Sequence, residues 1–201
     1  MDYSFLGLDY DNSGAIVPLT QEVDFTFLNP KGGLSYRLNE YSEAYGSVAV
    51  ANREPVRNDF TESTSFSRPR HETLIDYEAG YKLSTRKAFL NANIYYMDYR
   101  DQLILTGQIN DVGAYARVNV ANSYRAGIEL DGGYLITRKL GLAGNLTLSQ
   151  NKIQEFTEYV DEFDASFNYL GQREIVHENT DLAFTPNMIA SGAINLSLIH
   201  I

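Results

Sequence analysis

Apolar and polar side chains alternate with a period of two along most of this chain, and this alternation constrains its fold more than any other feature. Successive side chains of a β-strand point to opposite faces, so the pattern indicates strands with one apolar and one polar face. No segment offers a convincing helical period. In the clearest segment, residues 73–84, one set is Ile75, Tyr77, Ala79, Tyr81 and Leu83, and the other includes Asp76, Glu78 and Lys82.

The connections between the expected strands alternate in length. Short turns at one rim and long loops at the other are typical of transmembrane barrels. The sequence therefore predicts an all-β, antiparallel up-and-down transmembrane β-barrel, with the loops 52–72 and 152–181 at the same rim. The eight expected strands lie near 3–8, 31–38, 43–52, 73–84, 87–105, 114–136, 139–151 and 182–196. The connections are long at 9–30, 52–72 and 152–181, intermediate at 106–113, and short at Asn39–Ser42, Thr85–Arg86 and Thr137–Arg138.

Strand length and charge placement favour a membrane barrel over a soluble sheet. The alternation persists over 23 positions in 114–136, whereas strands of soluble proteins average about 5–6 residues. Backbone groups in lipid must all be paired, so only a closed barrel is stable there. We expect the apolar set, with Leu142 and Leu146, on the convex face towards lipid, where a charge costs roughly 2–4 kcal/mol. The opposite, concave face should carry Glu78, Lys82, Arg125, Glu129 and Asp131.

Composition excludes several classes of protein. A net charge of −10 leaves no basic stripe for nucleic acid. The absence of Cys excludes a disulfide scaffold and a Cys-ligated metal. No apolar run approaches the roughly 20 residues of a transmembrane helix. The N-terminus lacks the basic and apolar regions of a secretory signal peptide, so we expect that Met1 is not the natural start of an exported chain.

No catalytic constellation is present, so neither an enzyme nor a cofactor is expected. The sequence has no GxSxG, HExxH or phosphate-binding glycine loop before a helix. His71–Glu72 and His177–Glu178 end two long loops, and a metal site shared between them is one hypothesis. Two separate solvated His–Glu pairs are the more ordinary interpretation, and we predict no metal.

Ligand-binding candidates lie in the two long loops. The 152–181 loop is strongly acidic and interleaves its acids with the aromatic residues Phe156, Tyr159, Phe163 and Tyr169. Aromatic rings suit stacking on a ligand, although a solvated surface loop is the simpler interpretation. In the 52–72 loop, Arg53 and Arg57 would suit an anionic ligand or a lipopolysaccharide phosphate, with internal salt bridging as the simpler alternative.

An ordered series of segments resembles the TonB-dependent receptors of Gram-negative outer membranes, and the loop start REPVRNDF most resembles those of the Bacteroidetes. The segments are NPKGGLSYRL (29–38), EAYGSVAVA (43–51), REPVRNDF (53–60), ETLIDYEAGYK (72–82), FLNANIYYMDYRDQL (89–103), VANSYRAGIELDGGY (120–134) and FTPNMIASGAINL (184–196). The resemblance implies 22 strands around an N-terminal plug. It also implies an extracellular ligand (siderophore-iron, cobalamin or glycan) and energy from the TonB complex.

The chain departs from that family pattern, because it has neither a plug nor the closing strands with their terminal aromatic residue. We therefore expect residues 1–201 to be about eight of 22 strands, from the middle to late barrel, importing a scarce nutrient together with the plug and the remaining strands. Two alternatives stay open: a complete small eight-stranded barrel with a structural or adhesin role, and a soluble β-sandwich binding module. Pairing between 3–8 and 182–196 would favour the small barrel, and Greek-key crossing would favour the sandwich.

Overall fold

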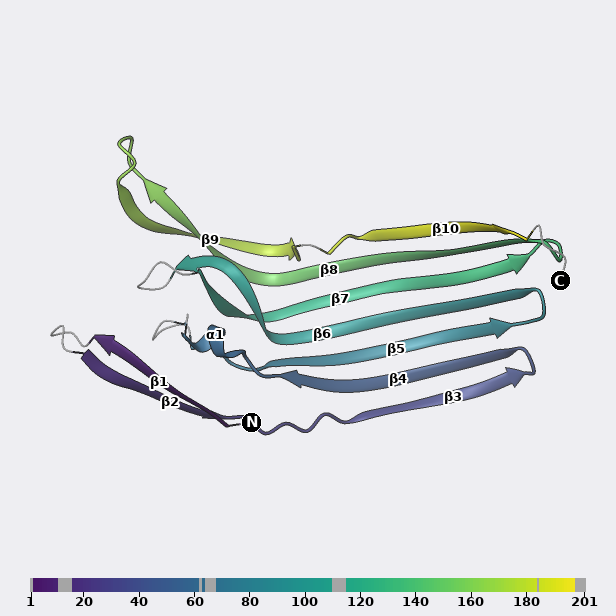
Figure 1. The fold of residues 1–201 in the computed structure, drawn as a ribbon, viewed down its shortest axis with the longest axis horizontal. Helices are drawn as coiled ribbons and strands as arrows, with labels where there is room; N and C mark the ends of the chain where they lie inside the picture. Colours follow the sequence, from purple (N-terminus) through teal and green to yellow (C-terminus); the bar gives the residue numbers. More distant parts are fainter. Residues whose placement is uncertain are drawn as a thin grey trace.

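The computed structural model describes residues 2–10, 16–61, 63, 68–109, 115–183 and 185–197, and most of them lie in long strands (Figure 1). No helix within these ranges is long and apolar enough to cross a membrane. The elements are β1 (Asp2–Tyr10), β2 (Ile16–Asp24), β3 (Lys31–Asn39), β4 (Ser42–Arg53), α1 (Arg57–Thr61), β5 (Glu72–Ser84), β6 (Ala88–Ile109), β7 (Tyr115–Leu135), β8 (Leu140–Phe163), β9 (Tyr169–Asp181) and β10 (Met188–Leu196).

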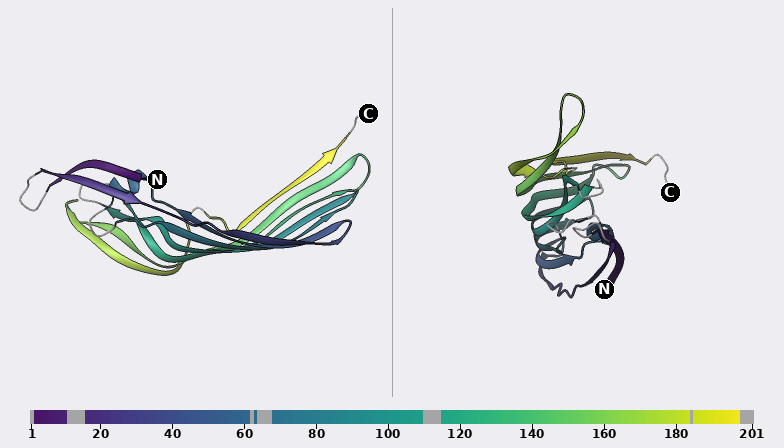
Figure 2. Two further views of the ribbon diagram at one scale, coloured as in Figure 1. Left: turned by 90° about the horizontal axis from the view of Figure 1, so that it is seen from below. Right: turned by 90° about the vertical axis from the view of Figure 1, so that its left-hand side faces the viewer.

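The strands follow simple up-and-down order. One sheet runs β10-β8-β7-β6-β5-β4-β3, with β9 also paired to β8, while β1 and β2 form a separate hairpin. All pairs are antiparallel, as predicted, and the described part contains no Greek-key crossing. Seen along its strands, the sheet is curved (Figure 2). No ladder joins β1 to β9 or β10 in the described ranges, so the closure that a small eight-stranded barrel requires is not formed there.

Residues 152–181 form a hairpin, and the prediction of a long loop there is wrong. β8 continues to Phe163 and pairs with β9 from Lys152↔Asp181 to Phe163↔Tyr169. The many carboxylates suggested a loop, but a hairpin with solvent on both faces tolerates charge on both. The predicted loop 9–30 is likewise largely wrong, because it contains β2 and the end of β1. The tip of that hairpin, 11–15, lies outside the described residues.

β9 and β10 occupy one place in the sheet, because both pair with β8 (Figure 1). Seven positions separate Asp181 from Met188, whereas four separate their partners Lys152 and Leu148, so three extra residues bulge out between them. The strand predicted at 182–196 therefore begins only at Met188. Backbone hydrogen bonds bracket the bulge, from Leu182 N to Asn151 O at 3.1 Å and from Ser149 N to Asn187 O at 2.8 Å.

The connections sort by length between the two ends of the sheet, as predicted. The turns at 40–41, 85–87 and 136–139 lie at one end, the short-turn end, while α1 and the tip of the β8–β9 hairpin lie at the other, the long-loop end (Figure 1). Each short turn is fixed by a side-chain oxygen that accepts from a backbone amide. The acceptors are Asn39 Oδ1 from Tyr41 N, Thr85 Oγ1 from Ala88 N and Thr137 Oγ1 from Leu140 N, at 2.8, 2.9 and 3.0 Å.

We call the part of the sheet between the row of Tyr77 and Tyr96 and the short turns the short-turn half. In this half, all charged side chains of the strands lie on one face of the sheet, the polar face, and none lies on the other, the apolar face. Strand register places Leu34, Gly46, Ala79, Ile94, Ile128, Leu148 and Met188 in one row of the apolar face. The row beside it, on the polar face, holds Tyr45, Gly80, Asn93, Glu129 and Thr147. This register confirms the predicted face sets. Large hydrophobic side chains of the apolar face are exposed, with Ile94 at 55%.

The buried apolar side chains gather in the remaining part of the sheet, the long-loop half. Phe60, Leu103, Val120, Ile153 and Leu182 are the buried large hydrophobic residues of the described chain, and all lie there. Val120, Ile153 and Leu182 form one cluster, against which Ile104 and Phe156 pack. Among the described residues, a conventional core therefore exists only in the long-loop half.

Candidate functional site

The sheet forks in its long-loop half. β7 and β8 pair only as far as Ser123↔Ile153. Beyond that row β7 continues with β6 to Tyr115, while β8 continues with β9 to Phe163. The two hairpins diverge from this point (Figures 1 and 2). The apolar cluster of Val120, Ile153 and Leu182 fills the base of the fork, so it fixes where the hairpins separate.

A polar cavity of about 700 Å³ opens between the diverging hairpins, and we call it the fork cavity. One wall comes from 118–124 of β7 and the other from 154–159 of β8, with Glu178 and Asn179 from β9. Amides, hydroxyls and carboxylates dominate the lining, which suits directional recognition of a polar ligand. The polar side chains that line it are Asn119, Asn122, Tyr124, Gln154, Glu155, Thr157, Tyr159, Glu178 and Asn179.

Two of the predicted aromatic residues, Phe156 and Tyr159, line this cavity. The Phe156 ring stacks on His177 with centroids 5.0 Å apart, and His177 Nε2 lies 2.7 Å from Glu158 Oε2. These contacts cross the β8–β9 hairpin and hold Phe156 in place. Burial raises the pKa of the Tyr159 hydroxyl, and the Glu174 carboxylate raises it further. Tyr159 therefore stays a neutral hydrogen-bond donor at physiological pH.

The other predicted pair, Phe163 and Tyr169, lies at the tip of the hairpin instead of in the cavity. Their rings meet edge to face at 5.8 Å, and the residues are 55% and 51% exposed. Asp164 closes the turn beneath them: its carboxylate accepts from Ser166 N and Asn168 N and from Asn168 Nδ2, all within 2.9 Å. These hydrogen bonds, led by that of the Asn168 side chain, lower the pKa of Asp164.

The predicted arginines of the 52–72 loop are engaged within the protein. Arg53 forms an ion pair with Glu72 at 2.8 Å, and Arg57, in α1, also has a partner. Asp59 is 3% exposed, lies 3.5 Å from Arg117 and accepts a hydrogen bond from Val56 N. Internal salt bridging, the simpler of the two interpretations, therefore describes this loop.

A junction that the sequence did not reveal holds the loop against β6 and β7. Asn119 Oδ1 accepts from Arg70 N at 2.7 Å, and Asn119 Nδ2 donates back to Arg70 O at 2.9 Å. The Arg70 guanidinium contacts Asp101 at 2.6 Å, and Asp101 has a positive φ of 53°. Asn119 also lines the fork cavity, so the same side chain couples the loop to the site. A lone Asn within a strand gave no signal of this role.

The two histidine pairs lie in different surroundings. His71 packs against Phe25 and Phe27, with ring centroids 6.1 and 5.1 Å away, whereas His177 packs against Phe156. The structure therefore does not bring them together as a shared metal site. In the described ranges no group of three His, Asp or Glu side chains is arranged to hold a metal ion.

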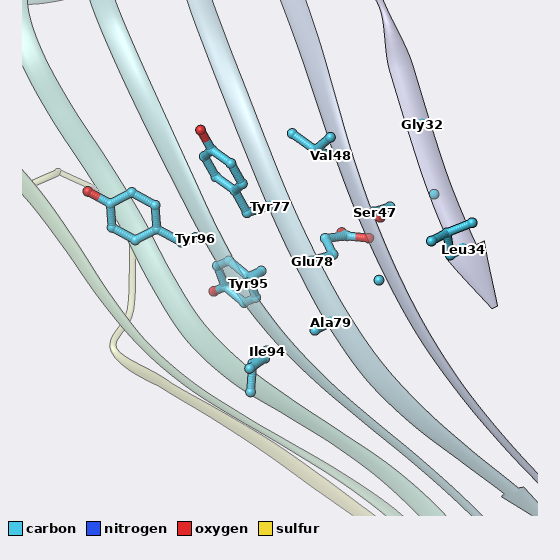
Figure 3. A pocket seen from close by; sticks show the side chains of 12 residues that line it. Gly32, Leu34, Ser47, Val48, Tyr77, Glu78, Ala79, Ile94, Tyr95 and Tyr96 are labelled. Carbon is cyan, nitrogen blue, oxygen red and sulfur yellow. The ribbon is translucent and has the colours of Figure 1, made fainter. Parts of the chain in front are cut away.

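A larger hollow of about 810 Å³ lies on the apolar face of β3–β6 (Figure 3). Gly32, Gly46 and Ala79 form its floor because they lack bulky side chains, and larger side chains rise around them. Few polar groups converge on it, which argues against a site for a polar ligand. The surrounding side chains are Leu34, Val48, Tyr77, Ile94 and Tyr96.

Comparison with known proteins identifies a family with this architecture. Residues 2–197 match the family model described as TonB dependent receptor-like, beta-barrel. Similar solved structures include the siderophore receptor PiuA from Acinetobacter baumannii (TM-score 0.63, 16% identity, 98% of this chain and 27% of that chain). The ferric yersiniabactin uptake receptor FyuA from Yersinia pestis has a TM-score of 0.61 at 15% identity, over 91% of this chain and 25% of that chain.

The ferric-catecholate import receptor Fiu from E. coli K12 has a TM-score of 0.59 at 18% identity, over 98% of this chain and 28% of that chain. The chain thus spans about a quarter of the length of these structures. At such identities the structures establish the fold, and the family model establishes the kinship. This chain therefore belongs to the TonB-dependent receptor-like β-barrel family, whose members are transporters of the Gram-negative outer membrane and not enzymes.

Proposed function

We propose that this chain is a barrel segment of an outer-membrane receptor that imports a scarce nutrient, and that the fork cavity contacts the ligand. The position of that cavity carries the proposal. It opens at the long-loop end, which faces the cell exterior in barrels of this kind, and its lining is polar and aromatic. A captured ligand would meet these side chains before it reached the barrel interior.

The lining favours a ligand rich in hydrogen-bond donors. Glu155 and Glu178 bring negative charge to the cavity, while Asn119, Asn122 and Gln154 bring amides that donate and accept. Tyr159 adds a flat ring and a hydroxyl. Such a surface suits a hydroxyl-bearing siderophore–iron complex, with cobalamin or a glycan as the alternatives. The siderophore class is preferred because the similar structures are a siderophore receptor (PiuA), a ferric yersiniabactin uptake receptor (FyuA) and a ferric-catecholate import receptor (Fiu).

The rest of the receptor would supply what this segment lacks. β3 and β10 end the sheet, and an unpaired strand edge is a template for another strand. We infer that further barrel strands pair there, that residues 1–201 form middle to late strands, and that lipid and lipopolysaccharide surround the apolar face. The polar face, with Tyr45, Asn93 and Glu129, would contact the plug, through which the TonB complex drives transport.

The experiment compares two places on the same hairpin. In the receptor that carries this segment, Tyr159→Ala with Glu178→Gln alters the fork cavity, and Phe163→Ala with Tyr169→Ala alters the exposed tip as a matched control. Cells receive a ferric catecholate, cobalamin or a glycan as the sole source of the limiting nutrient. We expect the cavity variant to need about tenfold more ligand for half-maximal growth, a loss of about 1.4 kcal/mol, while the tip variant changes little.

Surface abundance of each variant is measured in parallel, so that poor assembly is not mistaken for poor capture. Unchanged growth of the cavity variant on all three ligands, at normal abundance, would refute the proposed role of the cavity. An equal loss in the tip variant would instead move the ligand contacts to Phe163 and Tyr169.

A further inference from the structure

The β8–β9 hairpin has two faces whose acids are neutralised to different degrees. Alternate side chains of a strand share a face, so the register of β8 with β9 assigns each carboxylate to one of them. On the face of Phe156, every carboxylate of the hairpin has a basic partner, and we call it the compensated face. The pairs are Lys152 with Asp181 at 2.8 Å, Glu158 with His177 at 2.7 Å and Glu162 with Arg173 at 2.9 Å.

The opposite face of the hairpin, the acidic face, carries four carboxylates and no Lys, Arg or His. They are Glu155, Asp161, Glu174 and Glu178. Glu155 and Glu178 lie directly opposite each other in the register, and like charges in such cross-strand positions destabilise a sheet. Asp161 accepts a hydrogen bond from Gln172 Nε2 at 2.9 Å, which is a neutral partner. Among the described residues, the negative charge of this face therefore has no basic partner.

The acidic face contributes its two opposed carboxylates to the fork cavity. The lining residues that belong to this face are Glu155, Thr157, Tyr159 and Glu178. None of the compensated carboxylates lines the cavity, and no Lys or Arg is among its lining residues. The wall from β7 adds amides and a tyrosine hydroxyl, which carry no charge. The lining is therefore negative, so it attracts a cationic group and repels an anionic one.

The ring of Tyr159 is a second feature of the cavity that favours a cation. Elsewhere on the polar face, Lys82 lies 4.9 Å from the ring centroid of Tyr45, and Arg125 lies 5.3 Å from that of Tyr99. None of the described cations lies over the ring of Tyr159. A protonated amine held between this ring and the opposed carboxylates would gain a cation–π contact and charge-assisted hydrogen bonds.

We propose that the fork cavity receives a protonated amine of the ligand, which lies between Glu155 and Glu178 and against the ring of Tyr159. The imported ligand is then a siderophore–iron complex that carries an ammonium group, and an anionic complex such as a ferric tris-catecholate is repelled. This inference rests on the proposed function, because it assigns a charge to the ligand of the same cavity. The ammonium group of the ligand does for the acidic face what Lys152 and Arg173 do for the compensated face.

The test compares two iron complexes that differ by a single charge. Ferrioxamine B carries a free ammonium group, and its N-acetylated form has the same hydroxamate iron centre without that charge. Isothermal titration calorimetry measures the affinity of the whole receptor, purified in neutral detergent, for each complex. We expect acetylation to weaken binding about tenfold, because hydrogen bonds to charged groups are stronger than neutral ones. The preference should shrink as the salt concentration rises, because Glu155 and Glu178 are exposed.

Two double variants that remove the same amount of charge locate the ammonium group. Glu155→Gln with Glu178→Gln should make the affinities for the two complexes equal. The matched control, Glu162→Gln with Asp181→Asn, removes carboxylates from the compensated face and should keep the preference. The first variant should unfold at no lower temperature than the wild type, because it relieves the repulsion between opposed carboxylates. A lost preference is then not a lost fold.

Several results would overturn the inference. They are equal affinities of the wild type for the two complexes, binding of neither complex, and tighter binding of ferric enterobactin, a catecholate trianion, than of ferrioxamine B. A preference for the ammonium group that survives in Glu155→Gln with Glu178→Gln would overturn it as well.

The failure of this inference and the failure of the proposed function give different results. If Tyr159→Ala with Glu178→Gln impairs growth on the ferric catecholate, the proposed function stands and the charge assigned to the ligand is wrong. If that variant grows normally on every ligand, ferrioxamine B included, while the wild type still prefers the ammonium group, the proposed function alone is contradicted.

Discussion

The short-turn half and the long-loop half of this sheet follow different physical rules. In the short-turn half, the apolar face carries no charged residue in any row and no large hydrophobic side chain is buried. In the long-loop half, the described residues form a small apolar core, six ion pairs of Arg or Lys with a carboxylate, and the contact of His177 with Glu158. One half is organised for lipid as its solvent, and the other is organised for water.

The row of Tyr77 and Tyr96 marks the boundary between these two halves. The ring of Tyr77 lies 6.5 Å from Tyr96, which in turn stacks on Tyr124 at 5.9 Å. One row further towards the long-loop end, Asp98 and Lys152 appear on the same face. From Tyr96 to Ala88 the apolar face runs about 26 Å along the strand, which at the usual strand tilt of about 35–45° is roughly 20 Å of the height of a transmembrane band. We infer that the aromatic row lies near the interface of the membrane at the long-loop end.

A charge placed on the apolar face of the short-turn half should have the largest effect. Leu130→Arg puts a cation at the middle of the band, in the row of Ala92, and should destabilise the folded barrel by about 2–4 kcal/mol. Its sequence neighbour provides the control, because Glu129→Arg places the same side chain on the polar face. The measurement is the folded fraction of the whole receptor in lipid vesicles. Equal folded fractions of the two variants would contradict the assignment of the apolar face to lipid.

Truncation of the core in the long-loop half should have the next largest effect, and it should stay local. Leu182→Ala removes a buried side chain from the cluster with Val120 and Ile153 and should cost about 2–3 kcal/mol. Hydrogen exchange should then accelerate in β9 while β5 and β6 keep their protection. Leu196→Ala, on the exposed apolar face of the same sheet position, is the control. An equal acceleration of hydrogen exchange in all strands of the sheet would show that the two halves unfold as one cooperative unit.

The smallest effect concerns the tip of the β8–β9 hairpin and depends on pH. The pKa of Asp164 is lowered in the folded state, so its hydrogen bonds stabilise the turn at pH values above the ordinary Asp pKa. That stabilisation is lost as the pH falls through the depressed pKa. Pepsin cleavage at the tip should therefore increase only at the acid end of a pH series. Asp164→Asn should abolish the pH step, and an unchanged step would assign it to another carboxylate.

The strands of the short-turn half were predictable from sequence, because lipid on one face requires strict alternation of apolar and polar side chains. Each residue of a segment such as 73–84 can then be assigned to one face, and the short turns between such segments can be located as easily. β9 was missed because a strand with water on both faces needs no alternation and accepts carboxylates. Within the site, Phe156 and Tyr159 were recognisable as aromatic residues among acids. Asn119 was not, because its role depends on Arg70, 49 positions away in the chain.

The three-residue bulge between β9 and β10 has a consequence for how such a receptor can diversify. On one side of the bulge, β10 keeps its register with β8 from Met188 onward. On the other side, β9 keeps its own register with β8 up to Asp181. Residues gained or lost inside the bulge would shift neither ladder. The β8–β9 hairpin can therefore be lengthened, shortened or exchanged without a change in the register of β10 with β8. A graft of a foreign hairpin at this joint would be the natural starting point for retargeting the receptor.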